Sequence, residues 1–185
     1  MKTRSKKFRQ GFTLVEMLAV ITIIVILAAV TMIGLGYARD KQARSKATVQ
    51  INLLSNALEE YKLDTGAYPV GGNAARGDSN IVYRALYWDT DDNGNGADAD
   101  REQKIYLADL DPENDKQGWI DGNKTNAKII DPWGNEYYYR SGKTTEGKAN
   151  PAAINPDFDL WSAGPDGKTS KGANTDATKA DIKNF

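Results

Sequence analysis

The sequence contains neither cysteine nor histidine. Without cysteine, no disulfide framework and no thiolate metal site can form. Without histidine, zinc sites, serine–histidine triads and most acid–base catalysis near neutral pH lose their usual side chains. No phosphate-binding loop is found, and although glycoside chemistry could use pairs of the 25 acidic residues, no other catalytic element accompanies them. The composition therefore favours a binding or structural protein over an enzyme.

Positive charge is scarce outside the start of the chain. The sequence has 24 basic and 25 acidic residues, and five of the basic ones stand among the first eleven residues, which hold no acid: Lys2, Arg4, Lys6, Lys7 and Arg9. Without these five, 19 basic residues face 25 acidic ones, and no basic stripe remains, so no nucleic-acid partner is expected. A chain of 185 residues can form one domain with a core, plus a short appendage.

A long apolar run follows the basic start. Residues 12–38 contain one charged side chain, Glu16, so residues 17–38 are uncharged throughout. A helix of this length spans about 30 Å of hydrocarbon. The preceding cations predict that the N-terminus stays in the cytoplasm and that the chain after Ala38 crosses the membrane. The alternative is a secretory signal peptide, whose apolar region would be shorter and would end at a small-residue cleavage site.

After Ala38 the apolar residues form a stripe with steps of three and four: Ala43, Ala47, Ile51, Leu54, Ala57, Leu58 and Tyr61. This spacing predicts an amphipathic helix over residues 39–64 that continues the apolar one. No proline interrupts residues 12–64, and Gly66 followed by Pro69 predicts the end of the helix. A helix of about 80 Å, at 1.5 Å per residue, cannot be buried in a small globule. Its second half therefore needs a sheet packed along the stripe.

The rest of the chain supplies that sheet. Residues 70–130 are interpreted as a variable connector, whose residues 70–102 are irregular with one apolar patch at 82–88. Strands are expected at 128–131, 136–140 and 158–162, where aromatic and aliphatic residues alternate with turn residues. We therefore expect an α+β fold in which a long N-terminal helix packs on a small antiparallel sheet in residues 131–185. The four tryptophans fit core positions better than a binding face: Trp88, Trp119, Trp133 and Trp161.

The segment Lys7–Glu16, KFRQGFTLVE, resembles the leader and cleavage site of type IV prepilins. The resemblance implies that residues 1–11 are a leader, that a prepilin peptidase cuts between Gly11 and Phe12, and that the new amine is methylated. A carboxylate inside a membrane helix costs about 2.5–3.5 kcal/mol, so it needs a compensating partner. We expect Glu16 to neutralise the Phe12 amine of a neighbouring subunit in a filament. The alternative is a carboxylate that reaches the membrane surface from the helix end.

Four C-terminal segments resemble the major pseudopilin of type II secretion systems: YKLDTGAYP from Tyr61, DPWGNEYYYRSG from Asp131, FDLWSAGPDG from Phe158, and the ending Ala180–Phe185. The resemblance implies a single-pass inner-membrane subunit whose residues 39–185 lie in the periplasm. Such subunits polymerise through the N-terminal helix into a pseudopilus that drives protein export, together with minor pseudopilins, a secretion platform and an ATPase. One alternative is a major or minor type IV pilin of a surface pilus. Another is a membrane-tethered enzyme or sensor, which would leave Gly11 and Glu16 unexplained.

The same resemblance implies one calcium ion in the loop after the last strand. Asp166 is the first candidate ligand, Asp176 or Asp181 closes the site, and carbonyl groups at Ser162 and Ala163 complete it. Calcium takes six to eight oxygen ligands at about 2.3–2.6 Å, which acidic side chains and backbone in short loops can supply. The alternative is an ordinary turn with solvated acids.

A second acidic loop has the spacing D-x-D-x-N-G. Asp89, Asp91, Asn93 and Asp100 occupy the first, third, fifth and twelfth positions, and Gly94 would permit the sharp bend of a calcium loop. The twelfth residue is Asp rather than Glu, and flanking helices are not evident. A second calcium site and a solvated acidic loop both fit this segment.

Overall fold

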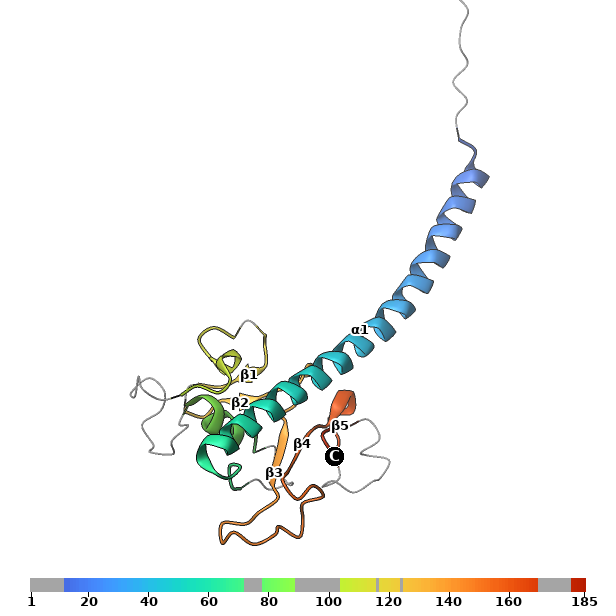
Figure 1. Ribbon diagram of the computed structural model, residues 1–185. Coiled ribbons are helices and arrows are strands. Elements are labelled where there is room, and N and C mark those ends of the chain that lie inside the picture. Colours follow the sequence, from blue (N-terminus) through green and yellow to red (C-terminus); the bar gives the residue numbers. More distant parts are fainter. Residues whose placement is uncertain (1–11, 72–77, 89–103, 116, 124, 170–180) are drawn as a thin grey trace, which may run out of the picture. The chain divides into compact units, whose positions relative to one another are not determined.

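The computed structural model describes residues 12–71, 78–88, 104–115, 117–123, 125–169 and 181–185, without the side chains of residues 32–35. The chain divides into two units, residues 1–41 and residues 42–185. Helix α1, Leu14–Thr65, is a single helix of 52 residues that belongs to both units (Figure 1). The uninterrupted helix expected from residues 12–64 is therefore confirmed.

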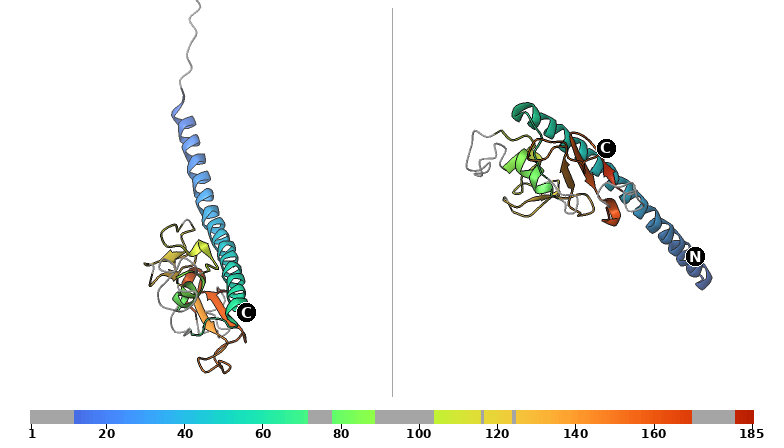
Figure 2. Two further views of the ribbon diagram at one scale, coloured as in Figure 1. Left: turned by 60° about the vertical axis from the view of Figure 1, so that its left-hand side comes forward. Right: turned by 90° about the horizontal axis from the view of Figure 1, so that it is seen from below.

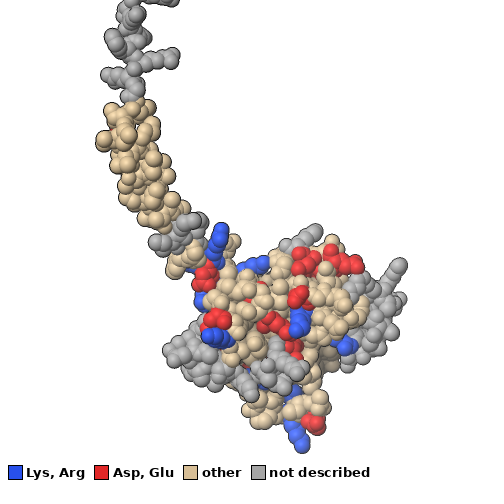
Figure 3. Space-filling model, turned by 180° about the vertical axis from the view of Figure 1, so that it is seen from behind, with Lys and Arg blue, Asp and Glu red and all other residues tan. Residues whose placement is uncertain are grey.

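In the first unit, α1 presents apolar side chains to the outside. Every described side chain from Phe12 to Thr31 is exposed, and the backbone stays helical through residues 32–35. In Figure 3 the visible described part of this segment shows no charged side chain, whereas acids and cations intermingle over the second unit. Among the described residues, α1 is the one helix long and apolar enough to cross a membrane. An apolar surface on all sides is the pattern of a membrane-spanning helix.

In the second unit, α1 buries one face. Ala47, Leu54 and Leu58 are fully buried and Ile51 and Ala57 nearly so, which confirms the predicted stripe. The helix ends as the sequence indicates: the N–H of residue 66 donates to the carbonyl oxygen of residue 62 at 2.8 Å, and its φ is 84°. Glycine adopts this left-handed conformation without a steric penalty, so it terminates helices readily.

The sheet that covers this face has three antiparallel strands in the order β3-β4-β5. Strand β3 is Tyr138–Ser141, β4 is Phe158–Ser162 and β5 is Ile182–Lys183. A separate antiparallel pair joins β1, Ile120–Asp121, to β2, Lys128–Ile129. Both views in Figure 2 show the C-terminal half of α1 alongside the sheet. The expected α+β class, with a helix packed on a small antiparallel sheet, is confirmed.

The core lies between the helix and the sheet. Ile51, Leu54 and Leu58 of α1 belong to one apolar cluster with Tyr139 of β3 and Leu160 of β4. Two of the four tryptophans, at positions 119 and 161, are almost fully buried, and the tryptophan at 88 packs against the cluster. The interpretation of the tryptophans as core residues therefore holds for these three.

The interpretation of residues 70–102 as irregular is wrong in part, because this stretch contains helix α2, Ser79–Tyr83, and the π-helical turn η1, Arg84–Trp88. The variable connector continues through the 3₁₀ turn η2, Ala108–Leu110, to the β1–β2 pair, and β2 lies within the strand expected at residues 128–131. The buried side chains of α2 and η1 are those of Ser79, Val82, Tyr83, Ala85 and Leu86. The residue before α2 makes no capping hydrogen bond with its side chain. Burial rather than a local start signal stabilises these short helices, so the sequence gives no sign of them.

Candidate functional site

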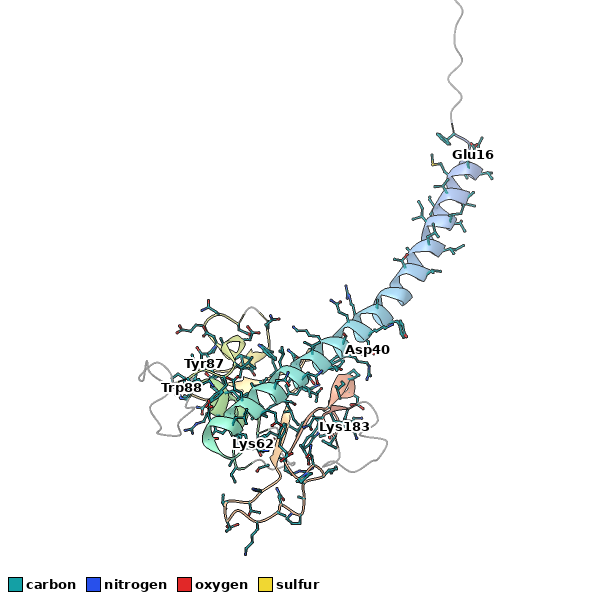
Figure 4. All side chains as sticks on the ribbon, viewed as in Figure 1. Glu16, Asp40, Lys62, Tyr87, Trp88 and Lys183 are labelled. Atoms are coloured by element: carbon teal, nitrogen blue, oxygen red, sulfur yellow. The ribbon has the colours of Figure 1, made fainter. Side chains whose placement is uncertain are left out.

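The first turn of α1 holds the carboxylate expected to act in assembly. The backbone N–H of Thr13 donates to Oε2 of Glu16 at 2.8 Å, and the Thr13 hydroxyl donates to the same oxygen at 2.9 Å. In return, the N–H of Glu16 donates to the Thr13 hydroxyl oxygen at 3.3 Å. Figure 4 shows Glu16 at this end of the helix. The two residues form a reciprocal capping box, with threonine at the N-cap and glutamate three residues later.

The capping box gives Glu16 a second role that the sequence interpretation missed. The pattern Thr-x-x-Glu was visible before the apolar run, but Glu16 was interpreted only as an assembly residue. The hydrogen bonds hold the carboxylate near the helix start, where the helix dipole favours negative charge. Phe12 directly precedes this box and is 78% exposed. Gly11 lies outside the described residues.

In the second unit, two of the acids expected to bind calcium, Asp166 and Asp181, interact electrostatically. Oδ2 of Asp181 accepts a hydrogen bond from the Thr169 hydroxyl at 3.0 Å, whereas Oδ1 is buried and has no hydrogen-bond partner among the residues that the structure describes. The pKa of Asp181 is raised above its ordinary value, mainly because the carboxyl is buried. The hydrogen bond from Thr169 and the positive charge of Lys183 oppose this shift, whereas the negative charge of Asp166 adds to it. A buried carboxylate oxygen without a donor, close to a second acid, is an arrangement that a cation would stabilise.

The other expected ligands also have defined surroundings. The Ser162 hydroxyl donates to Oδ2 of Asp131 at 2.5 Å and accepts from the N–H of Gly164 at 2.9 Å. Both bonds of this hydroxyl are made within the protein, so the backbone carbonyl remains the candidate ligand at Ser162. Ala163 is buried directly after β4. Asp176 lies outside the described residues, and the described ones contain no group of three acids suited to a metal.

Asp131 is a structural residue that the sequence interpretation assigned only to a turn. Its Oδ1 accepts the N–H groups of Trp133 and Asn135 at 3.0 and 2.9 Å. Through Oδ2 it also holds the end of β4 at Ser162. The side chain of Asn135 donates to the carbonyl oxygen of Gly164 at 2.9 Å, so the turn at 131–135 supports the expected calcium loop. The pattern Asp-Pro-Trp-Gly-Asn was the available signal.

The second acidic loop cannot be placed, because Asp89, Asp91, Asn93 and Asp100 lie outside the described residues. The chain that follows it is fixed at the end of α1. Nζ of Lys104 lies 2.8 Å from Oε1 of Glu60 and 2.6 Å from Oδ2 of Asp64. Tyr106 donates to the same oxygen of Asp64 at 3.2 Å.

One buried ion pair has a structural explanation. Arg140 donates through Nη2 to Oδ2 of Asp159 at 2.6 Å, and both side chains are buried. Asp159 also accepts the N–H groups of Ile154 and Asn155 at 3.0 and 2.8 Å. These bonds join β3 to β4 and hold the loop between them. The pair is therefore part of the scaffold, not a reactive site.

Two family models match this chain. Residues 6–32 match the prokaryotic N-terminal methylation motif, and residues 99–185 match type II secretion system (T2SS), protein G. The first match includes the capping box and the expected cleavage site. The second includes the sheet and the expected calcium loop.

Similar proteins agree with these matches. A protein of Escherichia coli K12, type II secretion system core protein G, is 30% identical over 98% of this chain and 94% of its own length. A protein of the same name from Vibrio cholerae is 31% identical over 74% of this chain and 75% of its own length. The crystal structure of the major pseudopilin of enterohaemorrhagic E. coli superposes with a TM-score of 0.43 at 23% identity, over 81% of this chain and 92% of that one. The two close sequence relationships, each spanning most of both proteins, confirm the resemblance: this chain belongs to the type II secretion system protein G family, the major pseudopilins.

Proposed function

We propose that this pseudopilin is inserted in the inner membrane through residues 12–38, is cut between Gly11 and Phe12, and polymerises into a periplasmic filament that drives export. The observation that supports this proposal most is the carboxylate of Glu16 at the start of α1, whose described side chains up to Thr31 are all exposed and mostly apolar. The match of residues 6–32 to a methylation motif supports the cut and the methylation of the new amine.

In this proposal Glu16 forms an ion pair with the Phe12 amine of the next subunit. A carboxylate in hydrocarbon is costly, and a positive charge placed beside it reduces that cost. The capping box holds Oε2 near the N-terminus of the mature chain, so the acid of each subunit lies where amines of neighbours would gather. The ion pair would set the axial register while the apolar helices pack together. Assembly would use a secretion platform and an ATPase, with minor pseudopilins as further partners.

The charge and the capping function of Glu16 can be separated by experiment. Glutamine also completes a capping box but has no charge, whereas leucine supplies neither. We expect Glu16→Gln and Glu16→Leu both to insert in the membrane, to be cut normally, and to form few or no fibres. The measurement is the amount of sheared fibre relative to membrane-bound subunit, seen by immunoblotting and electron microscopy. Normal fibres from Glu16→Gln would leave capping as the role of this residue and would remove the charge-pairing step.

A calcium ion in the C-terminal loop is the second part of the proposal. Asp166 and Asp181 would supply carboxylate oxygens, Ser162 and Ala163 would supply carbonyl oxygens, and Asp176 is a further candidate. The support is Oδ1 of Asp181, which is buried and has no hydrogen-bond partner among the described residues, together with the electrostatic interaction between Asp181 and Asp166. The ion would neutralise these acids and fix the loop between β4 and β5, a task that a disulfide performs in other secreted domains.

A second ion at Asp89, Asp91, Asn93 and Asp100 remains a separate hypothesis based on their spacing. Native mass spectrometry of the chain in calcium counts the bound ions directly. Two ions in the unmodified chain and one in the Asp91→Asn variant would support the second site. A single ion in both would remove it.

A further inference from the structure

The densest basic segment after residue 11 directly follows the apolar run. Residues 39–46 contain four basic side chains and one acid, and no other eight consecutive residues after position 11 hold more than two basic ones. The segment is part of the continuous helix α1, and Figure 4 labels Asp40 within it. Basic residues beside a membrane helix normally mark its cytoplasmic end, and in this chain the five cations before residue 12 predict that end. The segment after Ala38 is therefore expected on the other side, where orientation does not explain its charge.

Two of these cations lie at the expected edge of the membrane. As a helix, the uncharged run 17–38 is about 33 Å long, slightly more than the about 30 Å of the hydrocarbon core. Arg39 and Lys41 follow it within about 5 Å along the helix axis. The headgroup layer on each side of a bilayer is about 5–7 Å deep, so both side chains begin inside it. Lys46, about 12 Å beyond Ala38, begins outside it.

Arg39 and Lys41 are available for a partner outside the protein. Both side chains are exposed, and neither has a hydrogen bond or an ion pair with any residue that the structure describes. Asp40 and Arg44, in contrast, make contacts within the protein. Tyr37, two residues before Arg39, is 76% exposed. Tyrosine is enriched where a membrane helix meets water, because its ring is apolar and its hydroxyl is polar.

The chemistry of the two cations fits a phosphate group. A guanidinium donates two parallel hydrogen bonds to phosphate oxygens, and an ammonium binds phosphate as a point charge. An anionic membrane surface attracts basic residues next to a membrane helix, and the attraction falls off within about 10 Å at moderate salt. The depth of Arg39 and Lys41 therefore matches that of lipid phosphates.

We propose that Arg39 and Lys41 bind the phosphate groups of anionic phospholipids in the leaflet that the chain reaches after crossing the membrane. Tyr37 lies at the boundary of the same leaflet. This inference rests on the proposed function, because lipid phosphates are within reach only when residues 12–38 span the membrane. The contact holds the unassembled subunit at a fixed depth and is lost when the subunit leaves the membrane for the filament.

The first test measures the access of a water-soluble acetylating reagent to Lys41. The full chain is placed in lipid nanodiscs of phosphatidylcholine alone, or of equal parts phosphatidylcholine and phosphatidylglycerol. Peptide mass spectrometry should show Lys41 modified several-fold more slowly in the anionic membrane, whereas Lys148, an exposed lysine of the second unit, should change little. Equal modification of Lys41 in both membranes would overturn the proposal. Protection of Lys41 by inorganic phosphate in phosphatidylcholine nanodiscs would also overturn it, because the ligand would then be a free phosphate.

The second test removes the charges. Native mass spectrometry of the chain released from the mixed nanodiscs identifies the lipids that stay bound. The unmodified chain should retain phosphatidylglycerol several-fold over phosphatidylcholine, and Arg39→Gln with Lys41→Gln should lose most of this preference. The matched control, Lys148→Gln with Lys168→Gln, removes two exposed cations from the second unit and should keep it. An inserted Arg39→Gln, Lys41→Gln variant that keeps the preference, or an equal loss in both double variants, would contradict the proposed site.

The outcomes separate this contact from the proposed function. A chain that does not insert through residues 12–38 in either membrane would refute the membrane anchor, and the lipid contact with it. An inserted chain that shows no preference for phosphatidylglycerol would refute the lipid contact alone.

Discussion

The two halves of α1 share one continuous backbone but differ in what surrounds their side chains. From Leu14 to Thr31 the described side chains are all exposed and most are apolar. From Gln42 to Thr65 one face is buried in the core, while the rest is exposed or partly buried. Helices this long gain most of their stability from what they pack against. The first half therefore depends on lipid or other subunits, and the second half depends on its own domain.

The strongest test of this difference is a pair of adjacent leucines in the second half. Leu54 is fully buried, whereas Leu53 is 39% exposed on the opposite side of the helix. Leu54→Ala should lower the free energy of unfolding by about 2–5 kcal/mol, because it removes buried methyl groups and leaves a cavity. Leu53→Ala should have a much smaller effect. Urea unfolding of the full chain in detergent measures both, and equal losses would show that the two faces are not distinct.

Removal of calcium should also affect only the second unit. A ligand at 100 times its dissociation constant stabilises the folded state by about 2.7 kcal/mol. Chelation should therefore lower the melting temperature of the domain and leave the helicity of the first half unchanged. Asp166→Ala should remove the response to calcium, and Asp157→Ala, an exposed acid elsewhere in the second unit, is the control. A melting curve unchanged by chelation would remove the ion from the account.

The pH dependence of that response follows from Asp181. Burial raises the pKa of this carboxyl in the folded, metal-free domain. A raised pKa means that the group favours the folded state at low pH, and this contribution is lost as the pH rises through the folded-state pKa. Calcium needs the ionised form, so its stabilising effect should grow over the same interval. Melting curves with and without calcium between pH 4 and pH 7 measure the difference. A difference that does not change with pH would exclude Asp181 as a ligand.

The smallest expected effect concerns the capping box at the start of α1. Thr13→Ala removes the hydroxyl of the capping box but leaves the charge of Glu16. Backbone amides in the first turn should exchange with solvent several-fold faster, while unfolding of the second unit stays unchanged. Hydrogen exchange read by mass spectrometry in detergent detects this change. Thr22→Ala, whose hydroxyl bonds back to the carbonyl oxygen of Leu18 within the helix, is the control.

The sequence predicts the parts of this molecule that repeat a pattern. The apolar run, the stripe from Ala47 to Leu58 and the glycine after the helix each follow a spacing that physical rules interpret directly. Strand β4 was expected at the residues it occupies, and β3 begins two residues later than expected. The helix α2 was missed, since its start has no capping signal and its stability comes from burial.

In the candidate sites, too, the residues could be named from the sequence, whereas their contacts could not. The pattern Thr-x-x-Glu was present in the sequence, yet its hydrogen bonds became evident only with the helix start in place. Asp166 and Asp181 were named from a resemblance, and their proximity depends on how the end of the chain returns to β4. Among the described residues, the absence of a partner for Oδ1 of Asp181 could not be predicted, because it depends on how segments distant in the sequence pack together.

The role proposed for the first half of α1 requires that the mature chain begins at Phe12 with an amine that can pair with Glu16. Mass spectrometry of the N-terminal peptide from subunits isolated out of sheared fibres measures this directly. The account predicts a chain that starts at an N-methylated Phe12, with residues 1–11 absent. Fibres built from subunits that still contain residues 1–11 would contradict it, because no amine would then exist at Phe12 to pair with Glu16.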